Sequence, residues 1–201
     1  MIWSMGCRMP YERAINVGWI SETKPQIEYA DTTPDYDSMA GFFRSYHANA
    51  GRAVIPETVP KIVSWGHSRI TPLQAFGIGR RFIVDTVFQD IVERFEPEKH
   101  QFIPVEVVNA KSREPLCQRF FFNICTRIDS ISKEKTTAIQ PKNNGYEPTT
   151  GEIVFDTSLA HGHFLWVDRL MLGGTYANDQ IHAALAEANI SGLSFSLRNS
   201  I

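Results

Sequence analysis

An apolar strand that leads directly into a capped amphipathic helix, just after residue 80, limits the fold more than any other feature of this sequence. Residues 82–84 are Phe-Ile-Val, a short apolar run. Asp85 then offers an N-cap oxygen, and apolar side chains recur at helical spacing over residues 86–95 until Pro97 ends the helix. This part of the chain therefore predicts a sheet with a helix packed on it.

The rest of the second half predicts further strands and one more helix. A strand is expected at 102–108, where Pro104 favours an edge or a bulge, and a buried central strand at 120–125, the most apolar short run in the chain. Shorter strands are expected at 153–155, 163–167 and 193–197. Asn178 or Asp179 caps the last helix, and Gly192 can take the left-handed conformation after it. The prediction is an α+β fold, a mainly antiparallel sheet with two amphipathic helices.

The two helical regions resemble each other. A shift of 93 residues places Asp85 on Asn178, and it also superposes helix and strand positions: Phe88 on Ile181, Val92 on Leu185, Phe95 on Ala188 and Phe102 on Phe195. One interpretation is two similar strand–helix–strand units packed against a shared sheet. The alternative is chance, because capped helices before strands are common.

The first 79 residues have a different character from the remainder. Six prolines interrupt this region, which predicts loops and short strands. We therefore divide the chain into a loop-rich, variable N-terminal region, 1–79, and an α+β core, 80–201, which together form one continuous domain. Between residues 22 and 37 the chain carries five acidic side chains and a single lysine, typical of a solvated loop or of a surface for a basic partner.

Charge and cysteine content exclude several classes of function. The chain has 20 basic and 22 acidic residues, so it lacks the basic excess that nucleic-acid binding requires. Three cysteines without paired spacing suit a reducing compartment. The start carries no secretory signal pattern, and no stretch approaches the roughly 18 apolar residues of a membrane span. The expected location is the cytoplasm, with no nucleic-acid or membrane partner.

No motif predicts catalysis or a cofactor. The chain has no phosphate-binding loop, no dinucleotide fingerprint and no nucleophile elbow. His161 and His163 would share one face of a strand, and Asp156 or Asp168 could add a metal ligand, but the usual spacing of three or four ligands is missing. The simpler interpretation is that both histidines make ordinary hydrogen bonds near the start of a strand. We therefore assign no catalytic residue, metal or cofactor. Cys125 is expected to be a small core residue.

The second half resembles a bacterial immunity-protein family of polymorphic toxin systems, formerly catalogued as a domain of unknown function. The resemblance covers about residues 80–198. It lies in the strand and helix before His100, in the segment 100–107 with the form HxFxPVEV, in the aromatic strand 121–125, and in the C-terminal strand and helix up to Phe195. Alternating apolar placement indicates that the aromatic motif residues belong to the fold.

The resemblance implies a binding protein that does not catalyse a reaction. Such a protein neutralises the effector domain of a cognate toxin by stoichiometric interaction, in interbacterial competition through type VI or contact-dependent secretion. The least patterned region then becomes the expected toxin-binding surface, because tyrosines supply contact area and carboxylates steer a basic partner. The expected binding residues are Glu28, Tyr29, Asp31, Asp35, Tyr36 and Asp37.

Two alternative functions stay open from the sequence alone. The first is a small metal-dependent hydrolase that uses His161 and His163. The second is an adaptor without catalytic activity that forms a homodimer through the edge strand near Pro104.

Overall fold

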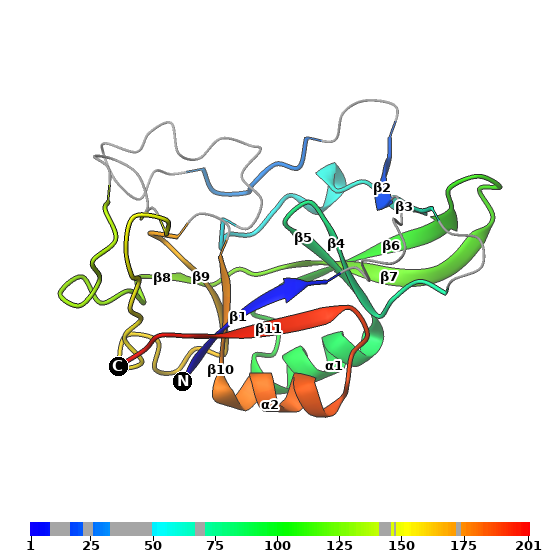
Figure 1. The fold of residues 1–201 in the computed structure, drawn as a ribbon. Helices are drawn as coiled ribbons and strands as arrows, with labels where there is room; N and C mark the ends of the chain where they lie inside the picture. The colour runs from blue at the N-terminus through cyan, green and yellow to red at the C-terminus, as the bar shows by residue number, and fades with distance from the viewer. Residues whose placement is uncertain are drawn as a thin grey trace.

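The computed structural model describes residues 1–8, 17–21, 26–32, 50–66, 71–140, 146, 148–171 and 174–201 of the chain. Within these residues the chain forms two sheets and two α-helices (Figure 1). The strands of sheet A are, in spatial order, β11 (Leu193–Arg198), β1 (Ile2–Cys7), β10 (Thr175–Asn178), β9 (Leu165–Asp168) and β8 (Arg127–Ile128). Those of sheet B are β2 (Val17–Ile20), β3 (Ile62–Trp65), β6 (Gln101–Asn109), β7 (Pro115–Asn123), β5 (Arg81–Val84) and β4 (Ala75–Ile78).

Most neighbouring strands run antiparallel. The parallel pairs among the described residues are β3–β6 in sheet B and β8–β9 in sheet A. A short 3₁₀ helix, Pro56–Thr58, precedes β3. The α+β fold with mainly antiparallel sheets, predicted from the sequence, is confirmed.

Both helices begin at a capping side chain, as the sequence predicts. Helix α1 (Thr86–Phe95) follows Asp85, whose carboxylate accepts a hydrogen bond from the Phe88 amide at 3.0 Å. Helix α2 (Asp179–Glu187) follows Asn178, whose side-chain oxygen accepts hydrogen bonds from two amides of the first turn. These contacts satisfy amides that have no partner within the helix.

Each helix joins two strands that lie on either side of a third. Helix α1 joins β5 to β6, with β7 antiparallel between them, and α2 joins β10 to β11, with β1 between them. The two strand–helix–strand segments lie in different sheets, so the expectation that they pack against one shared sheet is wrong. That the two segments form a repeat stays a prediction.

One apolar cluster joins both sheets and both helices. Figure 1 draws α1 and α2 side by side below the sheets. The helices contribute Phe88, Ile181 and Leu185 to this cluster. The buried residues that they meet come from sheet A (Met5, Leu165 and Val167) and from sheet B (Ala75, Val84 and Phe122). Further apolar clusters around Trp65 and around Trp166 involve sheet B and sheet A, respectively. The two sheets therefore share a continuous core.

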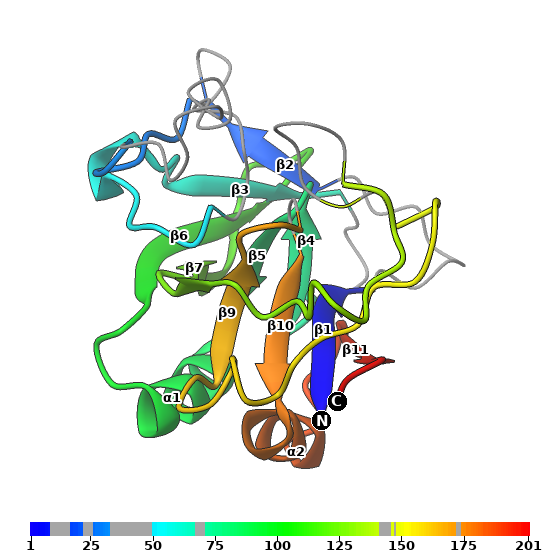
Figure 2. The ribbon, with the colours of Figure 1, turned by 90° about the vertical axis from the view of Figure 1, so that its left-hand side faces the viewer.

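The N-terminal strand completes sheet A. Strand β1 lies between β10 and β11, and its register pairs Ile2 with both Asn178 and Arg198. The two ends of the chain consequently lie close together (Figure 2). Strands from before residue 79 take part in both sheets, and the predicted boundary itself falls in the turn between β4 and β5. The division of the chain at residue 79 stays a prediction.

The predicted strands of the second half mostly form. Strand β7 is central in sheet B, between β6 and β5, as its apolar run indicates. Pro104 lies on β6 beyond the reach of β3, which pairs only with 106–109, so its missing amide costs no ladder hydrogen bond on that side. The strand expected at 153–155 is wrong, because within the described residues only isolated bridges form there, at Phe155. No helix in the described residues is long and apolar enough to cross a membrane.

Candidate functional site

The expected toxin-binding segment begins at the edge of the core around Trp65. Glu28, Tyr29 and Asp31 are described, and Asp35, Tyr36 and Asp37 lie outside the described residues. The backbone at Tyr29 forms an isolated bridge with Val54. The Glu28 amide donates a hydrogen bond to the Thr58 hydroxyl at 3.0 Å. This part of the segment is therefore fixed to the folded core.

The side chains of this segment alternate between the core and the solvent. Tyr29 is 8% exposed, and its hydroxyl accepts a hydrogen bond from the Ala50 amide at 3.2 Å. Glu28 is exposed, and the Asp31 carboxylate, 63% exposed, lies 3.2 Å from the Arg52 guanidinium. Tyr29 therefore anchors the segment, while Glu28 and Asp31 present their charges outward.

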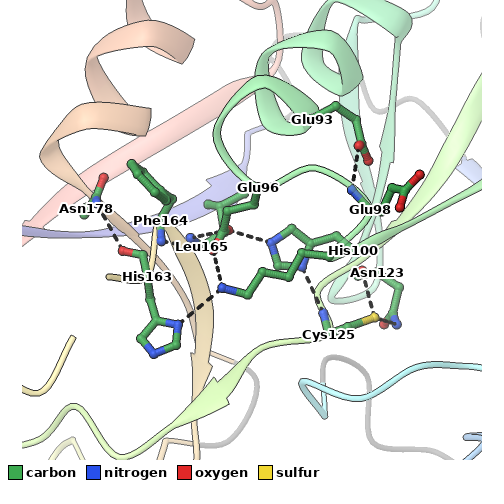
Figure 3. Close-up of polar contacts among 11 residues, drawn as sticks. Glu93, Glu96, Glu98, His100, Asn123, Cys125, His163, Phe164, Leu165 and Asn178 are labelled. Carbon is green, nitrogen blue, oxygen red and sulfur yellow. Dashed lines mark hydrogen bonds and ion pairs between the residues drawn. The ribbon is translucent and has the colours of Figure 1, made fainter. Parts of the chain in front are cut away.

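A buried polar cluster lies where α1 ends, and the sequence alone did not single it out. Glu96 follows the last residue of α1 and is 4% exposed. Its carboxylate accepts hydrogen bonds from Lys99 and His100, both at 2.7 Å (Figure 3). It also accepts hydrogen bonds from the amides of Phe164 at 3.3 Å and Leu165 at 3.0 Å, at the start of β9. One carboxylate thus ties the end of α1 to sheet A.

The hydrogen bonds of His100 fix its tautomer. The backbone amide of Cys125 donates to the ring Nδ1 of His100 at 3.1 Å, so this nitrogen must be the acceptor. The other ring nitrogen, Nε2, then carries the proton and donates it to Glu96. Both ring nitrogens of His100 are therefore occupied by protein hydrogen bonds.

The electrostatics of Glu96 also favour a structural role. Burial by itself raises the pKa of this carboxyl group, but hydrogen bonds from His100 and Lys99 outweigh that effect and hold its pKa at about 2. A carboxylate with so low a pKa and four donors around it is a poor general base at neutral pH. The cluster can position α1 against β9, and it offers no group for proton transfer.

A second buried acid plays a similar part within sheet A. Asp168 is 2% exposed and accepts hydrogen bonds from the amide and hydroxyl of Ser130, at 2.6 and 2.7 Å. The Leu170 amide donates to its other oxygen at 2.7 Å, and the Trp166 indole donates to the Ser130 hydroxyl at 2.9 Å. Burial raises the pKa of Asp168 in spite of these donors. The two carboxylate oxygens of Asp168 therefore hold Ser130, which follows β8, and Leu170, which follows β9.

The histidine pair considered as a metal site does not have the expected geometry. His161 belongs to a turn and His163 lies before β9 begins, so strand alternation does not bring their side chains to one face. The His163 ring nitrogen lies 3.4 Å from the Lys99 ammonium, and burial and that cation both lower the pKa of His163. The Asp168 carboxylate already accepts hydrogen bonds from the amide and the hydroxyl of Ser130. Within the described ranges, no group of three or more His, Cys, Asp or Glu side chains could hold a metal ion.

The cysteines are buried to different degrees and are thiols. Burial raises the pKa of Cys7 to about 12 and that of Cys125 to about 11. The Cys125 sulfur accepts a hydrogen bond from Asn123 at 3.4 Å beside the end of β7. A thiol whose pKa is raised in this way is a weak nucleophile at neutral pH.

The described residues belong to the class of two-sheet α+β proteins. The buried acids Asp85, Glu96 and Asp168 and the buried His100 are hydrogen-bonded to backbone amides and to neighbouring polar side chains.

The family is identified by a family model. The model of the immunity protein family Imm11 matches residues 52–197, most of the chain, and the protein belongs to this family. The predicted resemblance over 80–198 is thereby confirmed. No curated protein matches the chain significantly.

Proposed function

We propose that the protein is a cytoplasmic immunity protein that binds the effector domain of a cognate bacterial toxin and neutralises it by stoichiometric protein–protein interaction. The observation that carries the proposal is the match of residues 52–197 to an immunity protein family. The saturated hydrogen bonds of Glu96 and His100 support a role without catalysis. In this function the protein protects its own cell during interbacterial competition, against a toxin delivered by contact-dependent or type VI secretion.

We place the toxin-binding surface on the acidic segment 28–37. The segment lies outside residues 52–197, the part of the chain that matches the family, so it can carry contacts that are specific for one toxin. Glu28 and Asp31 extend from a rigid base, so little conformational entropy is lost when a partner binds them. Carboxylates at this position would steer a basic toxin, such as a nuclease, towards the surface.

The first test is co-expression with the C-terminal domain of the adjacent gene product. If the protein is the immunity partner, cells expressing the toxin domain grow only when it is present, and the two proteins co-purify as a stoichiometric complex. Sedimentation of the isolated protein separates a monomer from a homodimer. Strand β6, which contains Pro104, lies between β3 and β7 and is not the edge strand that the adaptor alternative assumed. Toxicity that persists without a complex would rule out immunity towards that toxin.

The second test addresses the surface. Replacing Asp31, Asp35 and Asp37 with Ala should weaken toxin binding by slowing association, and should flatten its dependence on ionic strength. The matched control replaces Asp90, Glu134 and Glu187, three acids that the structure describes as exposed, and therefore changes the net charge equally. Equal effects of the two triple variants would mean that overall charge, and not this segment, guides association.

A further inference from the structure

Strand β11 is a free edge of sheet A. It lies beside β1, and the described part of the chain places no further strand beyond it (Figure 2). With six residues it is longer than the other edge strands of the two sheets, since β8 has two residues and β2 and β4 have four each. Long edge strands usually carry a lysine, a proline or a bulge that discourages pairing with another chain. Residues 193–197 contain no lysine or proline, and their register with β1 is continuous.

Alternate residues of β11 direct their backbone groups away from β1. The Arg8 amide donates to the Gly192 carbonyl at 2.8 Å, just beyond the last pair of the β1–β11 ladder. Hydrogen-bonded pairs alternate along an antiparallel ladder, so the even-numbered residues of β11 bond to β1 and the odd-numbered ones point outward. The amides of Phe195 and Leu197 consequently donate to no acceptor among the described residues.

The outer side of this edge accepts strand pairing just beyond β11. The Phe155 amide donates to the Asn199 carbonyl, and the Ile201 amide donates to the Phe155 carbonyl, both at 2.9 Å. This short parallel bridge covers residues 199–201. It leaves the outward amides and carbonyls of residues 193–197 open to another strand.

The outward-paired residues also carry the apolar side chains of this edge. Phe195 packs against the shared core, and its ring lies 4.7 Å from that of His182 on α2. Leu197 is 54% exposed and Leu193 is partly exposed. No residue between Leu193 and Leu197 is charged. A second copy of the same edge would therefore cover apolar surface and meet no like charge.

We propose that the protein forms a two-fold symmetric dimer in which β11 pairs antiparallel with β11 of a second copy. The stretch 193–197 is Leu-Ser-Phe-Ser-Leu, which is the same in both directions. A two-fold axis at the central residue therefore pairs each residue with one of its own kind, namely Phe195 with Phe195, Leu193 with Leu197, and Ser194 with Ser196. The outward amide and carbonyl of Phe195 then bond to those of the second copy across the axis.

A dimer held by one pair of strands should be weak. Five residues from each copy bury less surface than the roughly 1,200–2,000 Å² of a stable interface. We therefore expect a reversible dimer with a dissociation constant on the order of 10⁻⁵ to 10⁻⁴ M. This pairing does not depend on the proposed toxin binding.

Sedimentation velocity of the protein, from well below to well above this concentration, tests the proposal. Leu197→Pro removes one outward amide and no hydrogen bond to β1, so it should weaken dimerisation roughly tenfold or more. Leu197→Val is the matched control, because valine has as many side-chain carbons as proline but keeps the amide, and it should dimerise like the parent protein. Circular dichroism verifies that both variants fold. A protein that stays monomeric throughout, or equal dimerisation of the two variants, would overturn the proposal.

A disulfide cross-link tests the register. In the proposed dimer, Ser194 of one copy lies opposite Ser196 of the other in a pair without hydrogen bonds, where the Cα atoms are about 4.5 Å apart and a disulfide can form. Oxidation of a mixture of Ser194→Cys and Ser196→Cys should therefore give covalent dimers faster than either variant alone. Equal rates in the three samples would contradict the proposal. So would a Leu197→Pro variant that loses toxin binding while the parent protein is a monomer, because the edge would then pair with the toxin.

Discussion

Glu96 connects two distant parts of the chain through a single side chain. Its pKa of about 2 lies below the ordinary value of 4.5, so ionised Glu96 stabilises the folded state by about 3 kcal/mol. Because the folded pKa is the lower one, this contribution is complete above pH 4.5 and disappears as the pH falls towards 2. Glu96→Gln should lower the free energy of unfolding at pH 7 by about 2–4 kcal/mol and flatten its decline in acid. Urea denaturation at several pH values measures both effects.

Glu93→Gln is the control for this prediction. Glu93 lies on the same helix and accepts a hydrogen bond from the Glu98 amide at 2.8 Å. The same chemical change should cost no more than about 1 kcal/mol there. If the free energy of unfolding fell equally in the two variants, the hydrogen bonds of Glu96 would contribute no more to stability than the single hydrogen bond of Glu93.

The turn after α2 lies against the start of β4, where the two backbones approach each other closely. The Ala75 amide donates to the Ser191 carbonyl at 2.9 Å, and Gly192 has a φ of 87°. A Cβ at Gly192 would overlap the Ala75 carbonyl oxygen, so Gly192→Ala should lower the free energy of unfolding by about 3 kcal/mol or more. Thermal denaturation followed by circular dichroism measures this loss.

Gly162→Ala separates the two causes of that loss. Gly162 has a φ of 83°, close to that of Gly192, but a Cβ at this position would meet no atom within 4 Å. Only the left-handed backbone should therefore be penalised, by about 1–2 kcal/mol. A loss as large as that of Gly192→Ala would show that backbone conformation, and not the approach to β4, explains both.

At the scale of the whole molecule, the shared apolar core should make the two sheets unfold together. Phe88 of α1 is completely buried, and its ring lies 5.0 Å from that of Phe122 in sheet B, within the cluster that also includes Leu165 of sheet A. Phe88→Ala should cost about 3–5 kcal/mol. Hydrogen exchange should then accelerate equally in β6 and in β9, because both are protected by the same global unfolding.

Leu197→Ala is the matched case at the surface. Leu197 lies on the edge strand β11 and is 54% exposed, so its loss should change the free energy of unfolding by no more than about 0.5 kcal/mol. Faster exchange confined to sheet B in Phe88→Ala would contradict a common unfolding unit.

The sequence by itself determined the local elements and the family. Helix α1 and its Asp85 cap, the central strand β7, and the second helix with its Asn178 cap follow from spacing and capping chemistry, which depend on neighbouring residues. At Gly192 the positive φ is confirmed, although the first left-handed residue after α2 is Asn189, with a φ of 48°.

Only the tertiary structure decided which elements meet. Strand β1 has no regular alternation of burial, yet it lies inside sheet A, paired with β10 on one side and β11 on the other. From the sequence, Glu96 could have been noticed only as an acid three residues before a lysine and four before a histidine, since its two backbone donors lie 68 and 69 residues away. Tyr29, expected at a binding surface, is instead buried in the core around Trp65. Pairing and burial depend on contacts between distant residues, and a local pattern does not specify them.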